Sequence, residues 1–213
     1  FAVANFNTTY SYTLNGGTPF TNQTATSISL NNLVAGTYTI VVTDSETNCQ
    51  ATSVVTVTQP TSALQFSAPF TPITCITNGN LNATATGGWG SYQYTLTQPD
   101  ATTIVQSNGV FGNLSQTGTY TISVQDANNC IVSTTFIINP TTNPDLTLSP
   151  TSNLCITNTS GASLIVTTTG GTPGYQYQIN GGAFQSSGSF TNLVAGTYTI
   201  KVRDSYGCED TIT

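Results

Sequence analysis

The pentapeptide Gly-Thr-Tyr-Thr-Ile occurs three times, at residues 36–40, 118–122 and 196–200. The copies lie 82 and 78 residues apart, which is repetition on the scale of a small domain. Each copy continues into a stretch in which apolar and hydroxyl-bearing residues alternate, as they do in a β-strand with one buried face. We expect the Tyr, the Ile and the Val two positions further on to point into a core. The repeat therefore predicts tandem antiparallel sheets, each with one face covered and one face in water.

The composition indicates an all-β chain that carries very little charge. Only 5% of the 213 residues are charged, against roughly 25% in typical soluble domains. The two basic residues, Lys201 and Arg203, cannot form a phosphate-binding patch, and the net charge of -6 opposes binding to nucleic acid. No run of 18 apolar residues suggests a membrane span. We therefore expect no nucleic-acid partner and no membrane insertion of this segment.

The order of motifs predicts three modules, at residues 1–60, 61–140 and 141–213. About seven short strands separated by turns make each module a β-sandwich of immunoglobulin-like type, arranged head to tail. Aligning the Tyr-x-Tyr strands of modules 1 and 2 places Phe1 well after the first cysteine of module 2. Module 1 is thus expected to be truncated at its start, and module 3 in its last strand, so that the chain reads as an excerpt of a longer protein.

Two smaller features recur with the modules. The Tyr of each Gly-Thr-Tyr stands near the start of its strand, which predicts a tyrosine corner, in which the hydroxyl bonds back to the backbone. Asp44, Asp126 and Asp204 each open a turn that ends in a cysteine, and an Asp at this place can accept bonds from the turn's own backbone. Calcium needs six to eight oxygen ligands, so one Asp in each turn falls short. With no His and no Cys-x-x-Cys either, we expect no metal and no cofactor.

Five cysteines recur in step with the modules and predict disulfides in an oxidising, extracellular compartment. Two pairings are open. Within modules, Cys75 would join Cys130 and Cys155 would join Cys208, closing loops of over 50 residues and stabilising each module by roughly 4 kcal/mol. Across junctions, Cys49 would join Cys75 and Cys130 would join Cys155. The first pairing is favoured if each module folds alone, although an immunoglobulin-like topology puts its two cysteines at opposite ends of the sandwich.

Taken in order, these motifs resemble a known repeat family. A cysteine, then GGxxxYxY, a variable loop, FxNLxxGTYTIxVxD and a final Asn-Cys or Gly-Cys are similar to the SprB-type repeat of very large cell-surface adhesins of gliding bacteria. The likeness is strongest at residues 179–208, while Gly-Thr-Tyr-Thr alone is also similar to PKD modules. In module 1, Asn5-Phe6 stands where the glycine pair would be, which puts that turn in question. The resemblance implies export by the type IX secretion system, a cell-surface location and a role in adhesion or gliding motility. It brings no catalytic residue with it.

The sequence therefore favours a stalk or filament segment of an extracellular surface adhesin. Its expected partners are extracellular polysaccharide or solid surfaces and the neighbouring repeats of the same chain. A carbohydrate-binding array is the alternative, because the indole of Trp89 in an inter-strand turn could stack on a sugar ring. An enzyme is not expected, since the chain has no His and its carboxylates belong mostly to repeat turns.

The scarcity of charge raises a question about the sheet edges, which proteins usually guard with Lys or Pro. Either glycans cover the surface, or arrays associate laterally with one another. Asp210-Thr211-Ile212 resembles the O-glycosylation motif of such bacteria, which makes Thr211 a candidate acceptor. Asn-x-Ser/Thr sequons, most of them expected by chance in so Thr-rich a chain, begin at Asn7, Asn22, Asn82, Asn113 and Asn158.

Overall fold

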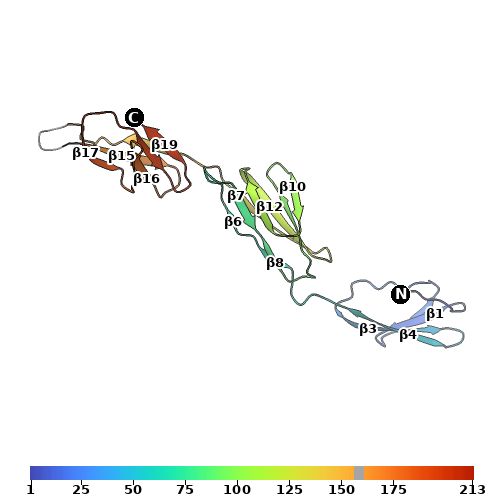
Figure 1. The fold of residues 1–213 in the computed structure, drawn as a ribbon. Helices are drawn as coiled ribbons and strands as arrows, with labels where there is room; N and C mark the ends of the chain where they lie inside the picture. The colour runs from blue at the N-terminus through green and yellow to red at the C-terminus, as the bar shows by residue number, and fades with distance from the viewer. Residues whose placement is uncertain (156–160) are drawn as a thin grey trace. The chain divides into compact units, whose positions relative to one another are not determined.

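The computed structural model describes residues 1–155 and 161–213, and every regular element in these ranges is a β-strand (Figure 1). The chain forms two compact units, Phe1–Ala63 and Leu64–Thr213. The first unit holds one hydrophobic core and the second holds two. Each core lies within one of the three modules expected from the repeat, and the names module 1, module 2 and module 3 are kept below.

Module 1 is built on one four-stranded antiparallel sheet in the order β2-β1-β3-β4. Its core is formed by Tyr10, Ile28 and Ile40, all of them buried. The edge strand β4 pairs with β3 and is exposed along almost its whole length. The strands are β1 (Tyr10–Leu14), β2 (Phe20–Gln23), β3 (Gly36–Asp44) and β4 (Gln50–Val57).

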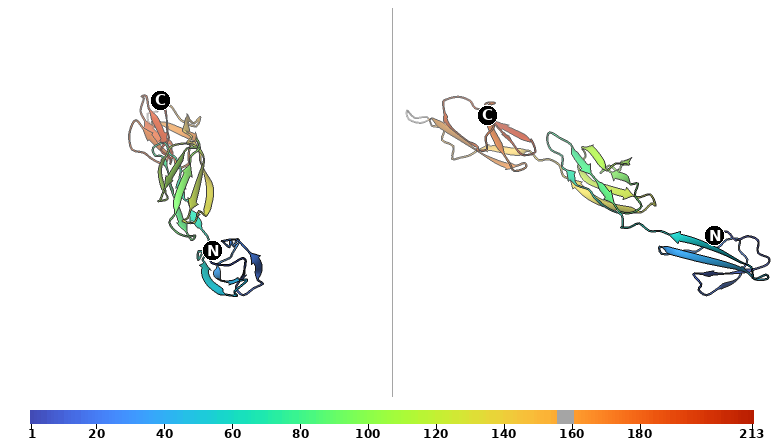
Figure 2. Two further views of the ribbon diagram at one scale, coloured as in Figure 1. Left: turned by 90° about the vertical axis from the view of Figure 1, so that its right-hand side faces the viewer. Right: turned by 60° about the horizontal axis from the view of Figure 1, so that its bottom comes forward.

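Module 2 is a sandwich of two main antiparallel sheets, seen from further directions in Figure 2. One sheet has the order β10-β9-β12-β13 and the other β11-β7-β6, while β5 and β8 form a separate pair. Leu96 and Ile122 from the first sheet and Leu81 and Phe111 from the second belong to the same buried core. The strands are β5 (Gln65–Ser67), β6 (Phe70–Thr71), β7 (Gly79–Asn82), β8 (Thr84–Thr86), β9 (Gln93–Thr97), β10 (Thr103–Gln106), β11 (Val110–Leu114), β12 (Gly118–Gln125) and β13 (Ile131–Ile138).

Module 3 has two three-stranded antiparallel sheets, in the orders β14-β15-β17 and β16-β18-β19. Leu146, Val166, Phe190 and Val202 are buried between them. The strands are β14 (Pro144–Leu148), β15 (Ala162–Gly170), β16 (Gln176–Ile179), β17 (Ser189–Leu193), β18 (Ile200–Arg203) and β19 (Glu209–Ile212).

The repeated pentapeptide forms or leads into a central strand in all three modules, namely β3, β12 and β18. Its isoleucine, at Ile40, Ile122 and Ile200, is at most 2% exposed. In each case this isoleucine lies opposite an apolar residue of the Tyr-x-Tyr strand that precedes it in the chain. The same strand pairing thus occurs in all three modules. Strand β18 is shorter than its counterparts because its partner β19 ends at Ile212, opposite Ile200.

The three tyrosine corners expected from the sequence are present. The hydroxyl group of Tyr38 donates to the carbonyl oxygen of Val34 at 2.7 Å, and Tyr198 donates to the corresponding carbonyl of Val194 at 2.8 Å. In module 2, Tyr120 bonds in the same way to Gln116 at 2.9 Å. Each bond spans four residues and ties the start of the central strand to the loop before it.

The chain therefore consists of tandem immunoglobulin-like β modules, of which modules 2 and 3 are two-sheet sandwiches, and the all-β expectation is confirmed. No helix in the described ranges is both long enough and apolar enough to cross a membrane. The module boundaries at residues 60 and 140 remain a prediction.

We predict that Ile122→Ala will lower the free energy of unfolding of module 2 by about 2–5 kcal/mol, because the cavity lies in a fully buried place. The matched control is Ile137→Ala on the neighbouring strand β13, where the side chain is 56% exposed and the loss should stay within about 0.5 kcal/mol. Urea unfolding followed by the fluorescence of Trp89, the one tryptophan of the chain, reports on this module. Equal losses in the two variants would contradict the assigned core.

Candidate functional site

The turn between β12 and β13 is organised by a buried carboxylate. The side chain of Asp126 is only 4% exposed. Its Oδ1 accepts the backbone N–H groups of Asn128 and Cys130, both at 2.9 Å. Its Oδ2 accepts the backbone N–H of Trp89 at 3.0 Å, from a loop 37 residues earlier in the chain. One carboxylate thus fastens the last hairpin of the module to its glycine-rich loop.

Module 3 repeats this arrangement around Asp204. Its Oδ1 accepts the N–H groups of Tyr206 at 2.9 Å and Cys208 at 2.8 Å, and its Oδ2 accepts the N–H of Thr172 at 2.7 Å. The turn that carries the final cysteine is therefore held in the same way in both modules. We call this arrangement the Asp anchor.

Module 1 has an Asp anchor as well, despite its different loop sequence. Asp44 accepts the N–H groups of Glu46 at 3.0 Å and Thr47 at 2.8 Å through Oδ1, and that of Asn7 at 2.8 Å through Oδ2. Asn5 adopts a positive φ of 62°, so it takes the left-handed conformation that a glycine supplies elsewhere. The turn that the sequence left in question is therefore formed.

The hydrogen bonds of the anchor also set the acidity of the carboxyl groups. The N–H of Asn7, followed by Thr47, lowers the pKa of Asp44 to about 2. For Asp126 burial raises the pKa, but the N–H groups of Trp89, Cys130 and Asn128 outweigh it, and the pKa is lowered overall. Both carboxylates are ionised at neutral pH, and each of their oxygens accepts at least one backbone N–H.

The glycine pair before Trp89 is required by the closeness of the anchor. Gly87 and Gly88 have φ values of 74° and 59°, which side chains rarely adopt. A Cβ on Gly88 would lie 2.6 Å from Oδ2 of Asp126. In module 3, a Cβ on Gly171 would lie 3.0 Å from Oδ2 of Asp204. The repeat motif therefore has glycine here because a side chain would collide with the carboxylate of the Asp anchor.

Trp89, the candidate ligand contact, sits on this anchored loop. The residue is half-buried, and its backbone N–H is held by Asp126. The backbone beneath the indole is therefore fixed by the fold. Contact of Trp89 with a sugar stays a prediction.

The cysteines are paired differently from both expectations. Cys75 is bonded to Cys208, with a Cα–Cα distance of 5.1 Å, whereas Cys49, Cys130 and Cys155 are exposed free thiols. Neither the pairing within modules nor the pairing across junctions given above is present, so both are corrected. The observed bond joins the first cysteine of module 2 to the last-turn cysteine of module 3.

The length of a sandwich explains why Cys75 does not reach Cys130. Cys75 stands just before Gly79, which lies against Ile138, at the end of module 2 where β12 begins. Cys130 follows the opposite end of β12. Eight residues of strand span about 27 Å, whereas the Cα atoms of a disulfide lie within about 7 Å of each other.

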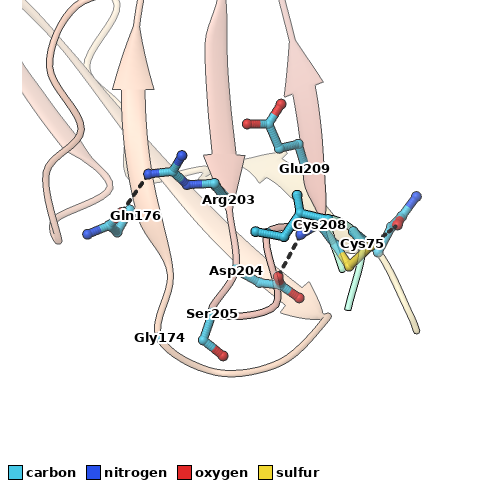
Figure 3. A pocket seen from close by; sticks show the side chains of 11 residues that line it. Cys75, Gly174, Gln176, Arg203, Asp204, Ser205, Cys208 and Glu209 are labelled. Atoms are coloured by element: carbon cyan, nitrogen blue, oxygen red, sulfur yellow. Dashed lines mark hydrogen bonds between the residues drawn. A yellow bond between two sulfur atoms is a disulfide. The ribbon is translucent and has the colours of Figure 1, made fainter. Parts of the chain in front are cut away.

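The bond forms where the end of module 2 adjoins module 3, and Figure 3 shows Cys75 and Cys208 side by side. Within module 3, Gly171 beside the Asp204 anchor lies against Pro144, the first residue of β14, so the Cys208 turn is at the end that receives the linker. The N–H of Cys75 donates to the carbonyl of Tyr206 at 3.0 Å. The one sign of this in the sequence is that an immunoglobulin-like topology puts the two cysteines of a module at opposite ends of its sandwich.

A cavity of about 740 Å³ lies beside the disulfide, with polar and apolar groups in its lining. In Figure 3, Arg203 points toward Gln176, whose Oε1 accepts a hydrogen bond from the guanidinium at 3.1 Å. The guanidinium also stacks over the ring of Phe184, 4.1 Å from its centroid. Glu209, another lining residue, pairs with Lys201 at 2.7 Å. Among the described residues no cluster of three or more His, Cys, Asp or Glu side chains is placed to hold a metal ion.

The candidate glycosylation sites are spread over the surface. Thr211 is exposed on β19, and the preceding Asp210 accepts the N–H of Leu146 at 2.8 Å. Asn158 lies outside the described residues. The other sequon asparagines, at Asn7, Asn22, Asn82 and Asn113, are exposed. Modification at any of these positions stays a prediction.

Residues 67–101 match the family model of the SprB repeat. The resemblance drawn from the sequence is confirmed for this segment, which runs from the end of β5 through Cys75, the glycine pair and the Tyr-x-Tyr strand. The matched segment lies in module 2, whereas the sequence motifs point most strongly to residues 179–208 of module 3. No curated protein matches the chain.

Several solved structures are similar to the chain at low sequence identity. The three N-terminal domains of the bacteriophage RB49 outer capsid protein Hoc are 15% identical, with a TM-score of 0.43, over 95% of this chain and 85% of that one. A tetra-tandem repeat from the extending region of a large adhesion protein is 19% identical, with a TM-score of 0.29, over 99% and 67%. The eight N-terminal Ig domains of the adhesion molecule DSCAM are 14% identical, with a TM-score of 0.33, over 95% and 31%.

We predict that Gly88→Ala will destabilise module 2 by about 2–4 kcal/mol, because the new methyl group strains the backbone and displaces Asp126 from the N–H of Trp89. Gly90→Ala is the matched control, since Gly90 has a similar φ of 70° but no atom within 4 Å of the added Cβ. This control should lose about 1 kcal/mol. Urea unfolding of both variants is the measurement, and losses of equal size would disprove the steric role of the anchor.

We predict that Asp44 stabilises module 1 above about pH 4 and ceases to do so near pH 2. Its folded pKa is lowered to about 2 from an ordinary value of 3.8, so its contribution is complete above the unfolded value and is lost as pH falls through the folded one. Asp44→Asn should therefore be less stable than the wild type at pH 6, and the two should converge toward pH 2. Urea titrations followed by the NMR signals of β3 test this.

The control for the acid titration is Glu46→Gln, which removes an exposed carboxylate of the same turn but none of the N–H bonds to Asp44. This variant should follow the wild type at both pH values. A gap between Asp44→Asn and the wild type that stays constant down to pH 2 would refute the prediction.

Proposed function

We propose that this chain is a repeat segment of an extracellular bacterial surface adhesin, in which tandem sandwiches serve as a stalk that contributes to surface attachment or gliding motility. The observation that carries the proposal is the SprB repeat at residues 67–101, set within an array of immunoglobulin-like modules. Export by the type IX secretion system belongs to the same proposal, because it follows from the family rather than from the geometry.

The covalent chemistry of the chain fits such a location. A disulfide between modules needs an oxidising compartment to persist, which a cell surface provides and a bacterial cytoplasm does not. The Asp anchors support a structural role as well, because Asp44, Asp126 and Asp204 each use both carboxylate oxygens to hold backbone N–H groups. The proposal therefore gives these carboxylates no catalytic role and requires no cofactor.

Binding of extracellular polysaccharide by individual modules is a second candidate. Its support is the placement of Trp89 on a loop whose backbone the Asp126 anchor fixes, because a rigid aromatic side chain loses little conformational entropy on binding. Lateral association of arrays is a further form of partnership. The exposed edge strand β4 supports it, with Val54 62% and Val55 37% exposed.

We predict that an in-frame deletion of residues 1–213 in the encoding bacterium will weaken attachment or gliding while the rest of the adhesin is still displayed. Protease treatment of intact cells should also cleave an epitope tag placed within these residues. Attachment to glass and to polysaccharide films, scored beside surface immunofluorescence, is the measurement. A tag that stays protected in intact cells, or normal attachment and gliding after the deletion, would overturn the proposal.

Purified wild-type chain and its Trp89→Ala variant separate the second candidate from the first. Saturable binding to a polysaccharide that Trp89→Ala abolishes, and Trp89→Phe retains in part, would assign sugar recognition to the module 2 loop. The Phe variant keeps an aromatic face and is therefore the matched control. Absence of binding in all three proteins would leave the chain with the stalk role alone.

A further inference from the structure

We propose that the Cys75–Cys208 disulfide is a covalent load path that removes residues 76–207 from any pulling force applied along the chain. The two cysteines are 133 positions apart in sequence, yet their Cα atoms lie 5.1 Å apart. Tension that reaches Cys75 from the N-terminal side therefore passes through two sulfur atoms to Cys208. Most of modules 2 and 3 lies in the loop that this bond closes.

The position of the bond decides which elements carry tension. Coming from module 1, the loaded chain runs through β5 and β6 to Cys75, crosses to Cys208, and leaves through β19. The long pairing of β12 with β13 and the whole of β15 lie between the two cysteines and are bypassed. The cores of modules 2 and 3 are thus formed largely by residues that carry no tension.

The elements that remain in the load path are short. Strand β5 pairs with β8 over three residues and β6 with β7 over two, while β19 pairs with β18 over four. Leu64 belongs to the module 2 core, with Phe66 and Ile73 packed against it. These contacts can peel away under tension, but the chain cannot lengthen beyond the point set by the disulfide, whether or not the modules stay folded.

The equivalent turn of module 2 provides an internal comparison. Cys130 occupies the same place in the Asp126 anchor as Cys208 does in the Asp204 anchor, with its N–H on Oδ1 at 2.9 Å and 2.8 Å respectively. Cys130 is nevertheless an exposed free thiol. Cys49, the cysteine of module 1, is a free thiol as well, so no disulfide within module 1 limits its extension under load.

The biological use of such a bypass rests on the proposed stalk function, because only a tethered adhesin is pulled along its length. The bypass itself follows from connectivity and does not depend on what the chain binds. Its test therefore involves no adhesion, and a failure in one leaves the other intact.

The experiment is single-molecule force extension of the full chain, held by handles at Phe1 and Thr213, with and without a dithiol reductant. The oxidised chain should reach at most about 270–290 Å, because only residues 1–75 and 208–213 extend, at about 3.3–3.6 Å per residue. The reductant becomes a cyclic disulfide and leaves two thiols on the protein, after which the limit should rise to about 700–770 Å. The expected gain is thus about 440–480 Å.

Variants fix the assignment to this one bond. Cys75→Ser should give the long extension with or without reductant, and this limit does not depend on whether the modules stay folded. Cys130→Ser, the matched control, should still lengthen only on reduction. Non-reducing peptide mapping of the same sample should recover Cys75 joined to Cys208. Full extension of the oxidised wild-type chain, or a map with any other pairing of Cys75, would overturn the proposal.

Discussion

The hydrogen bonding of one buried carboxylate in each module is the constraint on which the rest of this structure depends. A buried charge is costly unless its polar atoms are satisfied, and Asp126 meets this demand with three backbone N–H groups from two separate loops. The bond to Trp89 forces that loop so close to the carboxylate that glycine is needed at Gly88. The same carboxylate orients the turn that ends in Cys130. Loop, turn and cysteine therefore share one fixed geometry in modules 2 and 3, whereas in module 1 the Cys49 N–H donates to the Thr47 hydroxyl instead.

This geometry gives the two ends of a sandwich different cysteines. The Asp anchor places the last-turn cysteine at one end of a sandwich, and the topology places the first cysteine at the other. A sandwich is longer than any disulfide can span, so the two cysteines of one module do not meet. Cys75 lies at the end of module 2 that adjoins module 3, and Cys208 lies at the adjoining end of module 3, so these two cysteines are bonded.

The proposed stalk function rests on the family match together with the repeated modules and the disulfide between two of them. The SprB repeat at residues 67–101 contains both Cys75 and the glycine loop, so the matched segment includes the parts that make the anchor and the junction. Short strands, tyrosine corners and anchored turns are features of a scaffold, and the chemistry of the polar groups is used internally. An extracellular stalk needs a scaffold of this kind, and the oxidising conditions outside the cell allow a disulfide to persist there.

The sequence by itself determined what is local and periodic. Alternation fixed the buried face of Ile40, Ile122 and Ile200, and spacing of four residues fixed the bond from each corner tyrosine to its loop. Only the tertiary structure decided the rest. The third bond of each Asp anchor comes from a loop more than 30 residues away, and it survives in module 1 with Asn5 in place of glycine. The pairing of Cys75 with Cys208 depends on which ends of two sandwiches face each other, and side-chain periodicity carries no information about that.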